Sequence, residues 1–198
     1  MDPQRLEKQI RFVREVDKLK TIERQTLLTD ASRQENDAEH SWHLALMALV
    51  LGEYAKADDT IDLLQVIRMV LIHDLVEIDA GDTYCYDSVG YQDKAERETA
   101  AAERIFNLLP RDQAEAFRAL WDEFEAGETA EARFANALDR LQPLIHNAFT
   151  QGQMWQRHGI VKSQVVERNQ RIEAGAPDLW HFARELIENA VSRGHLAP

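Results

Sequence analysis

The stretch Leu63-Leu-Gln-Val-Ile-Arg-Met-Val-Leu-Ile-His-Asp-Leu-Val-Glu77 decides the fold, because a helical apolar repeat runs directly into a group of chemically active side chains. The apolar residues recur every three or four positions, a spacing typical of an amphipathic helix. They are Val66, Ile67, Val70 and Leu71. Asp62 is a suitable N-cap, so we predict a helix from Leu63 to about Val76.

The pair His73-Asp74 is the chemical core of this stretch. An adjacent imidazole and carboxylate can chelate a divalent metal, and a metal with open coordination positions can activate water or polarise a phosphate. A carboxylate at the negative end of a helix costs roughly a few tenths of a kcal/mol unless a cation offsets it. The pair therefore favours a metal site, with a solvated helix end as the alternative.

A second predicted helix, from Asp37 to about Ala57, supplies a further histidine. Asn36 or Asp37 caps it, and the run Leu44–Leu51 is apolar all round, which predicts a central buried helix. The short connection to the next helix favours antiparallel packing, which would bring His40 close to His73-Asp74. His43, one turn later, is the alternative ligand, and either histidine alone could simply be a core residue.

Three acidic residues complete the candidate site. Glu77 follows the pair by one turn and is placed to act as a general base, and Asp82 lies in the loop that comes next. Asp139 lies between Leu138 and Leu141 in a later predicted helix, so its buried charge requires a partner. That partner is either Arg140 or a metal.

The rest of the chain has helical periodicity almost throughout, with no alternating strand pattern of useful length. We expect an all-α, single-domain fold over 1–198 with some eight helices. The other predicted helices are Pro3–Lys20, Lys94–Leu108, Pro110 to Gly127, Ala130–Gln151 with a kink or split at Pro143, Ser163–Ala174 and Pro177–Arg193, and the predicted loops are Thr21–Glu35 and Ile78–Asp93.

Composition excludes several classes of function. The net charge of −12 repels nucleic-acid polymers and anionic membrane surfaces. Cys85 is the only cysteine, which excludes a disulfide framework within one chain. The first twenty residues have no apolar segment of a signal peptide, and no apolar run could span a membrane. We therefore expect a cytoplasmic protein with no nucleic-acid or membrane partner.

Competing catalytic patterns are absent from the sequence. It contains no His-Glu-x-x-His, no Gly-rich phosphate loop and no Gly-x-Ser-x-Gly. No glutamate stands three residues before a histidine, which argues against a di-iron bundle.

The combined motifs resemble a known family. They are Glu35-Asn36-Asp37-Ala38-Glu39-His40-Ser41-Trp42, His73-Asp74-Leu75-Val76-Glu77, Gly81-Asp82 and Leu138-Asp139-Arg140-Leu141-Gln142-Pro143. This ordered set looks like the HD-domain metal-dependent phosphohydrolases, and is similar to the branch of bacterial 5′-deoxynucleotidases and their eukaryotic relatives. The resemblance covers 18–159, and the C-terminal helices of 160–198 are expected to pack on this HD-type helical bundle.

The resemblance implies a site that holds one divalent metal. Its four ligands would be His40, His73, Asp74 and Asp139. Mixed nitrogen and oxygen ligation favours manganese, cobalt, iron or nickel over magnesium or zinc.

The resemblance also implies roles around the metal. Glu77 would activate or orient the attacking water, Asp82 would contact the sugar or assist the leaving oxygen, and Arg24 would bind the phosphate. Gln25, where relatives often have an aromatic residue, is expected in the substrate site. Gln25 and the 27–33 loop leave base preference open.

We expect a metal-dependent phosphomonoesterase that acts on small nucleotides, with deoxyribonucleoside 5′-monophosphates favoured. Two alternatives remain at this point: hydrolysis of a cyclic or polyphosphorylated nucleotide, and a non-catalytic metal-binding helical module. Relatives resembling this chain are commonly dimers, so a homodimer is also expected.

Overall fold

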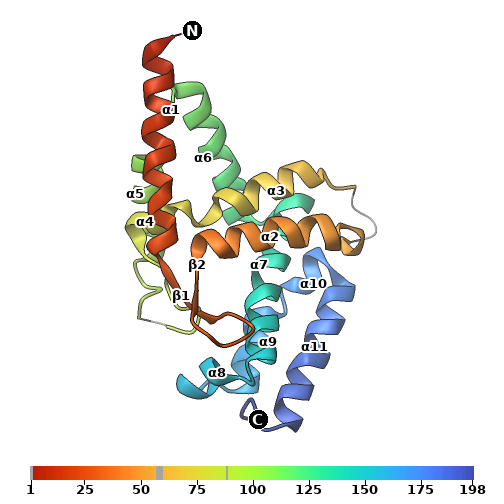
Figure 1. The fold of residues 1–198 in the computed structure, drawn as a ribbon. Helices are drawn as coiled ribbons and strands as arrows, with labels where there is room; N and C mark the ends of the chain where they lie inside the picture. The colour runs from red at the N-terminus through yellow and green to blue at the C-terminus, as the bar shows by residue number, and fades with distance from the viewer. Residues whose placement is uncertain (1, 57–59, 88) are drawn as a thin grey trace.

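The computed structural model describes residues 2–56, 60–87 and 89–198 (Figure 1). The α-helices are α1 (Pro3–Val16), α2 (Asp37–Leu51), α3 (Leu63–Ile72), α4 (Glu77–Ala80), α5 (Lys94–Phe106), α6 (Arg111–Ala126), α7 (Ala130–Phe149), α8 (Gln153–Arg157), α9 (Lys162–Asn169), α10 (Ile172–Gly175) and α11 (Pro177–Ser192). Three 3-10 helices, η1 (Asp17–Thr21), η2 (Gly52–Tyr54) and η3 (His73–Val76), and two strands, β1 (Glu23–Leu27) and β2 (Gln34–Asn36), complete the described elements. The expected all-α class is confirmed.

Helices α2, α3 and α7 form the centre of the fold. The first two run antiparallel, side by side, and α7 passes across them (Figure 1). Leu44, Val66 and Leu138, one from each helix, are fully buried in a shared apolar core. Burial of each such side chain contributes roughly 1.5–3 kcal/mol, so this contact rigidly fixes the helices that carry the histidines and Asp139.

The N-terminus of α2 is fixed by a reciprocal cap. The Asn36 side chain accepts a hydrogen bond from the Glu39 backbone, and the Glu39 side chain bonds back to the backbone of Asn36. This cap sets where the helix begins, and therefore which way its first turn, with His40, faces.

The prediction that α2 is buried on all sides is wrong. Leu44, Met47 and Ala48 are buried, but one face exposes large apolar side chains. The exposed residues are Trp42, Leu46, Leu49 and Val50. The predicted helix end at Ala57 lies outside the described residues.

The segment 21–35 is not the irregular loop that the sequence predicts. Strands β1 and β2 pair antiparallel, with Glu23 opposite Asn36 and Leu27 opposite Gln34. They are short and carry mostly polar residues, so they lack the apolar alternation by which strands are recognised. Their pairing places Arg24 and its neighbours beside the start of α2.

A second apolar cluster joins the N-terminal helices to the site. It includes Phe12 from α1, Leu75 and Val76 from η3, and Ile105 and Phe106 from α5. Helix α6 closes this cluster, and α1 extends along it (Figure 1). This packing fixes Leu75 and Val76, which directly follow His73-Asp74, against α1 and α5.

The C-terminal helices pack against α7. Trp180 and Ile187 of α11 and Ile172 of α10 belong to the same apolar core as Leu138. Pro143 lies within α7 without dividing it, so the predicted split is wrong. The helix predicted over 163–174 is divided into α9 and α10, and the short helix α8 was not expected. No described helix is both long enough and apolar enough to span a membrane.

Candidate metal centre and substrate cavity

The structure brings the four predicted metal ligands together from three elements. His40 comes from the first turn of α2, His73 and Asp74 from η3, and Asp139 from the middle of α7. Nε2 of His40 is 3.1 Å from Oδ1 of Asp139, and Nε2 of His73 is 3.1 Å from Oδ1 of Asp74. One nitrogen or oxygen atom each of His40, His73 and Asp74 lies within 4.8 Å of the others. This is the spacing of donors around a single ion.

The tautomer of His73 supports a cation at this position. Its Nδ1 is 2.9 Å from the carbonyl oxygen of Val70 and donates to it, which leaves a lone pair on Nε2. That Nε2 is buried and makes no hydrogen bond, although carboxylates of Asp74 and Asp139 lie near it. In the neutral ring this lone pair faces carboxylate oxygens, an arrangement that a cation between them satisfies, so the residues fit a divalent metal.

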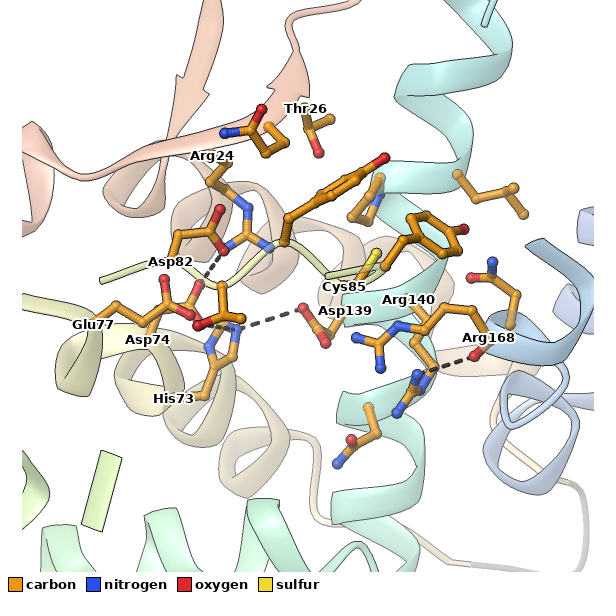
Figure 2. Close-up of a pocket in the computed structure, with 18 of the residues that line it drawn as sticks. Arg24, Thr26, His73, Asp74, Glu77, Asp82, Cys85, Asp139, Arg140 and Arg168 are labelled. Carbon is orange, nitrogen blue, oxygen red and sulfur yellow. Dashed lines mark hydrogen bonds and ion pairs between the residues drawn. The ribbon is translucent and has the colours of Figure 1, made fainter. Parts of the chain in front are cut away.

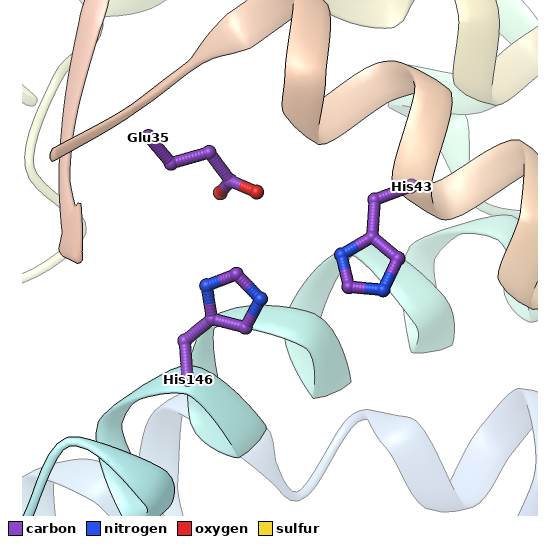
Figure 3. Close-up of side chains that lie close together, drawn as sticks. All are labelled: Glu35, His43 and His146. Carbon is purple, nitrogen blue, oxygen red and sulfur yellow. The ribbon is translucent and has the colours of Figure 1, made fainter. Parts of the chain in front are cut away.

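The sequence left two alternatives open: His43 in place of His40, and Arg140 as the partner of Asp139. The positions of these side chains favour neither alternative. His43 faces away from this centre, toward Glu35 and His146 (Figure 3). The close partners of Asp139 are the imidazoles of His40 and His73, and among the described residues Arg140 makes no ion pair with it. His40 is therefore the histidine that joins the pair.

Arg24 reaches into the centre from β1. Its Nη1 is 2.7 Å from Oδ2 of Asp74 and 3.0 Å from Oδ1 of Asp37, which is fully buried. Although burial opposes its charge, Asp74, Asp82 and Glu77 raise the pKa of Arg24 well above its ordinary value. The guanidinium is permanently charged and held against the carboxylate of Asp74.

Glu77 and Asp82 lie on the same side of the centre as Arg24 (Figure 2). The side chain of Glu77 is buried, and its Oε2 has no hydrogen-bond partner. Burial, with the negative charges of Asp74 and Asp37, raises the pKa of Glu77 well above its ordinary value. A raised pKa makes this carboxylate a stronger base than an ordinary glutamate.

The pKa values of Asp37 and His40 are also raised, which reflects the excess of negative charge at this centre. Burial, followed by the charge of Asp74, raises the pKa of Asp37 to about 7. Although burial and Arg24 oppose its protonation, Asp139 and Glu35 raise the pKa of His40 to about 9. Without a metal, protons on these groups supply the missing positive charge.

A cavity of about 320 Å³ opens beside the centre. Its wall includes Arg24, Gln25 and Thr26 from β1, the loop residues Asp82–Tyr86, and residues of α7 and α9. A volume of this size is enough for a small ligand. Gln25, for which the resemblance implies a substrate contact, is among these lining residues. Burial raises the pKa of the Cys85 thiol in the same wall, which makes Cys85 a poor nucleophile.

Behind His40 lies a second polar cluster of Glu35, His43 and His146 (Figure 3). The amide nitrogen of Gln142 lies at its centre, 2.6 Å from Oε1 of Glu35, 3.2 Å from Nε2 of His146 and 3.4 Å from Nδ1 of His43. The amide therefore fills the space between these groups. The other oxygen of Glu35 is 3.6 Å from Nδ1 of His40, so the cluster backs the metal centre.

The sequence did not single out several residues at this site. Asp37 and Glu35 lie in the quoted His40 motif, and their signal is a carboxylate placed before the buried helix. Arg168 lies far along the chain in α9, and nothing in its local sequence distinguishes it from a solvated arginine.

The fold and the centre identify the class of protein. The family model described as HD domain matches residues 16–180, and this chain belongs to that family.

Among curated proteins, the chain is 31% identical to human 5′-deoxynucleotidase HDDC2 over 137 residues, which cover 69% of this chain and 65% of that protein. It is 25% identical to Schizosaccharomyces pombe 5′-deoxynucleotidase hdd1 over 170 residues, which cover 83% of this chain and 74% of that protein. The chain thus spans only about 65% of the length of the human protein it matches.

Two solved structures are similar in fold. The crystal structure of a protein titled a predicted metal-dependent phosphohydrolase, from Magnetospirillum magnetotacticum MS-1, is 58% identical with a TM-score of 0.93, and the match covers 98% of this chain and 96% of that one. A conserved hypothetical protein from Pyrococcus furiosus is 24% identical with a TM-score of 0.64, covering 91% and 98%, and it supports the fold alone.

Proposed function

We propose that this protein is a metal-dependent phosphohydrolase that removes phosphate from small nucleotides, with deoxyribonucleoside 5′-monophosphates as the favoured substrates. The observation that carries the proposal is the meeting of His40, His73, Asp74 and Asp139 beside Arg24 at the wall of a cavity. The names of the human and fission yeast relatives support the choice of substrate.

The proposed ligands are the four residues predicted from the sequence. A divalent metal at this position supplies Lewis-acid activation of a water molecule and of the phosphate. The two neutral nitrogens and two carboxylates favour manganese, cobalt, iron or nickel over magnesium or zinc.

The chain's own groups divide the remaining work. Glu77 accepts a proton from the attacking water at its unpartnered Oε2. Arg24 binds the phosphate oxygens with its guanidinium and offsets the charge that develops on them. Asp82 contacts the sugar or the leaving oxygen, and Gln25, which lines the same cavity from β1, contacts the substrate.

The test is phosphate release from a panel of nucleotides with each metal added in turn. Deoxyribonucleoside 5′-monophosphates are expected to turn over fastest, and His73→Ala or Asp74→Ala should abolish turnover while the protein stays folded by circular dichroism. Full activity in either variant would overturn the mechanism. Preference for a cyclic or polyphosphorylated nucleotide would favour the second enzymatic reading, and a protein that binds no metal and hydrolyses no nucleotide would favour a non-catalytic helical module.

The proposal also covers the domain organisation, the oligomeric state and the cellular location of the protein. We propose that the whole of 1–198 acts as one domain, because the C-terminal helices share the core of α7. The exposed apolar face of α2, led by Trp42 and Leu49, supports a homodimer, and Leu49→Glu should shift the mass measured by analytical ultracentrifugation to that of a monomer. A cytoplasmic location, supported by the lone Cys85, is tested by cell fractionation.

A further inference from the structure

A second group of positive charges lies in the same cavity, away from Arg24. Arg140 of α7 and Arg168 of α9 both line the wall, and Figure 2 shows them across Asp139 from Asp74 and Glu77. Nη1 of Arg140 donates a hydrogen bond of 3.0 Å to the backbone oxygen of Arg168. The two arginines are thereby held next to one another at one end of the cavity.

Neither arginine has an acidic partner. Within the residues that the structure describes, no carboxylate is within ion-pair distance of either guanidinium, and the buried Nε of Arg140 has no hydrogen-bond partner. Burial, with the charges of Arg168 and Arg171, lowers the pKa of Arg140. Adjacent, partly buried cations are unfavourable unless an anion offsets them.

Two other cations of the cavity wall, Arg24 and Lys94, already have carboxylate partners. Arg24 pairs with Asp37 and Asp74, and Lys94 pairs with Glu98. In an acidic chain of net charge −12, a carboxylate could readily have been placed beside Arg140 and Arg168. Because none of the described carboxylates lies there, the charge of this pair is available to a ligand.

The geometry favours phosphate as that ligand. A guanidinium presents several N–H groups in one plane, which match phosphate oxygens two at a time. Asn169 and Tyr91, which also line the cavity, add neutral polar groups near the pair. The cavity of about 320 Å³ runs from the metal centre to this end, so one small ligand can contact both.

We propose that Arg140 and Arg168 form a second phosphate subsite, so that a nucleotide with one phosphate group at the metal centre and another at this pair binds more tightly than the corresponding monophosphate. The inference rests on the proposed function for the first phosphate. It adds a 3′,5′-bisphosphate or a 5′-diphosphate to the nucleotides that the cavity binds.

The test measures binding rather than turnover. In the Glu77→Gln background with manganese, calorimetry compares deoxyadenosine 5′-monophosphate with the 3′,5′-bisphosphate and the 5′-diphosphate. At least one two-phosphate nucleotide is expected to bind about 10- to 100-fold more tightly than the monophosphate, as charged hydrogen bonds to a phosphate predict. Which one gains shows whether the second phosphate sits on the 3′ or the 5′ side.

Arg168→Gln is the principal variant, because only its backbone oxygen takes part in the contact with Arg140. It should remove the advantage of the two-phosphate nucleotide and change the dissociation constant of the monophosphate by less than about twofold. Arg168→Lys keeps the charge without the planar fork and should retain part of the advantage. Arg157→Gln, at an exposed position of α8, changes the net charge equally and should change neither constant.

The experiment distinguishes failure of the phosphate subsite from failure of the proposed function. Equal affinity for all three nucleotides, or an advantage that survives Arg168→Gln, overturns the subsite, as does a protein that binds none of them. If monophosphates are not hydrolysed by the unmodified protein but the arginine-dependent advantage is seen, the subsite stands and the proposed function fails.

Discussion

Nη1 of Arg24 lies 2.7 Å from Oδ2 of Asp74, although the two residues are 50 positions apart in the sequence and come from β1 and η3. The contact is partly buried and ties the small sheet to the metal centre. Because the same guanidinium also reaches Asp37, β1 is held at a fixed distance from the proposed ligands. The strand pair therefore brings the guanidinium of Arg24 to the proposed metal ligands.

Replacing Arg24 should weaken catalysis more than it weakens the fold. Arg24→Gln is expected to lower kcat/KM for a deoxyribonucleoside 5′-monophosphate by about 10- to 150-fold, since a charged hydrogen bond to phosphate contributes about 1.5–3 kcal/mol. Arg24→Lys keeps the positive charge but lacks the planar guanidinium that can donate two hydrogen bonds to one phosphate, so it should recover part of the loss. Steady-state kinetics at saturating metal would contradict the role if Arg24→Gln kept the unmodified kcat/KM.

Glu77→Gln should separate proton transfer from metal binding. Loss of a positioned base typically lowers the rate by about 10²- to 10⁴-fold, so kcat should fall by this factor. The dissociation constant for manganese, measured by calorimetry, should change little because Glu77 is outside the four proposed ligands. Glu125→Gln is the matched control: burial raises the pKa of Glu125 in the same cavity wall, but no role is assigned to it. A kcat unaffected by Glu77→Gln would remove Glu77 as the base.

Metal affinity should depend on pH through His40. Its pKa is raised to about 9 in the metal-free protein, and a protonated imidazole cannot bind a metal. At any pH below about 9, binding must therefore displace a proton, and affinity should fall as the pH is lowered. Calorimetry at pH 7.5 in buffers of different ionisation enthalpy should detect proton release. Equal apparent binding enthalpies in all buffers would contradict this coupling.

Local patterns predicted the helices and pointed to His40, His73, Asp74 and Asp139 as candidates, because each lies on a helix or at its end, where apolar spacing fixes the direction of a side chain. That these four residues bind one metal was implied by the resemblance to the HD-domain family. The strand with Arg24 and the exposed face of α2 were not predicted. In the first case, the strands owe their existence to pairing rather than to apolar alternation. In the second, burial depends on which neighbours cover a helix, and hydropathy does not contain that information. Arg168 was missed for a related reason, since its only signal is the cavity it shares with residues distant in sequence.

Glu35 should strengthen metal binding without touching the metal. Its Oε1 accepts the Gln142 amide at 2.6 Å, which aims the other oxygen toward Nδ1 of His40 at 3.6 Å. A carboxylate behind a ligating histidine fixes the ring and raises its basicity, and loss of such a partner typically costs about 10- to 100-fold in metal affinity.

Glu35→Gln should therefore raise the manganese dissociation constant by about this factor, while kcat at saturating metal recovers to near the unmodified value. Glu23→Gln, an exposed change on neighbouring β1, should leave both quantities unchanged. If Glu35→Gln instead lowered kcat at every metal concentration while manganese bound normally, Glu35 would act on the reaction rather than on the ligand. Such a result would move the function of the Glu35, His43 and His146 cluster from positioning His40 to some contact with the substrate.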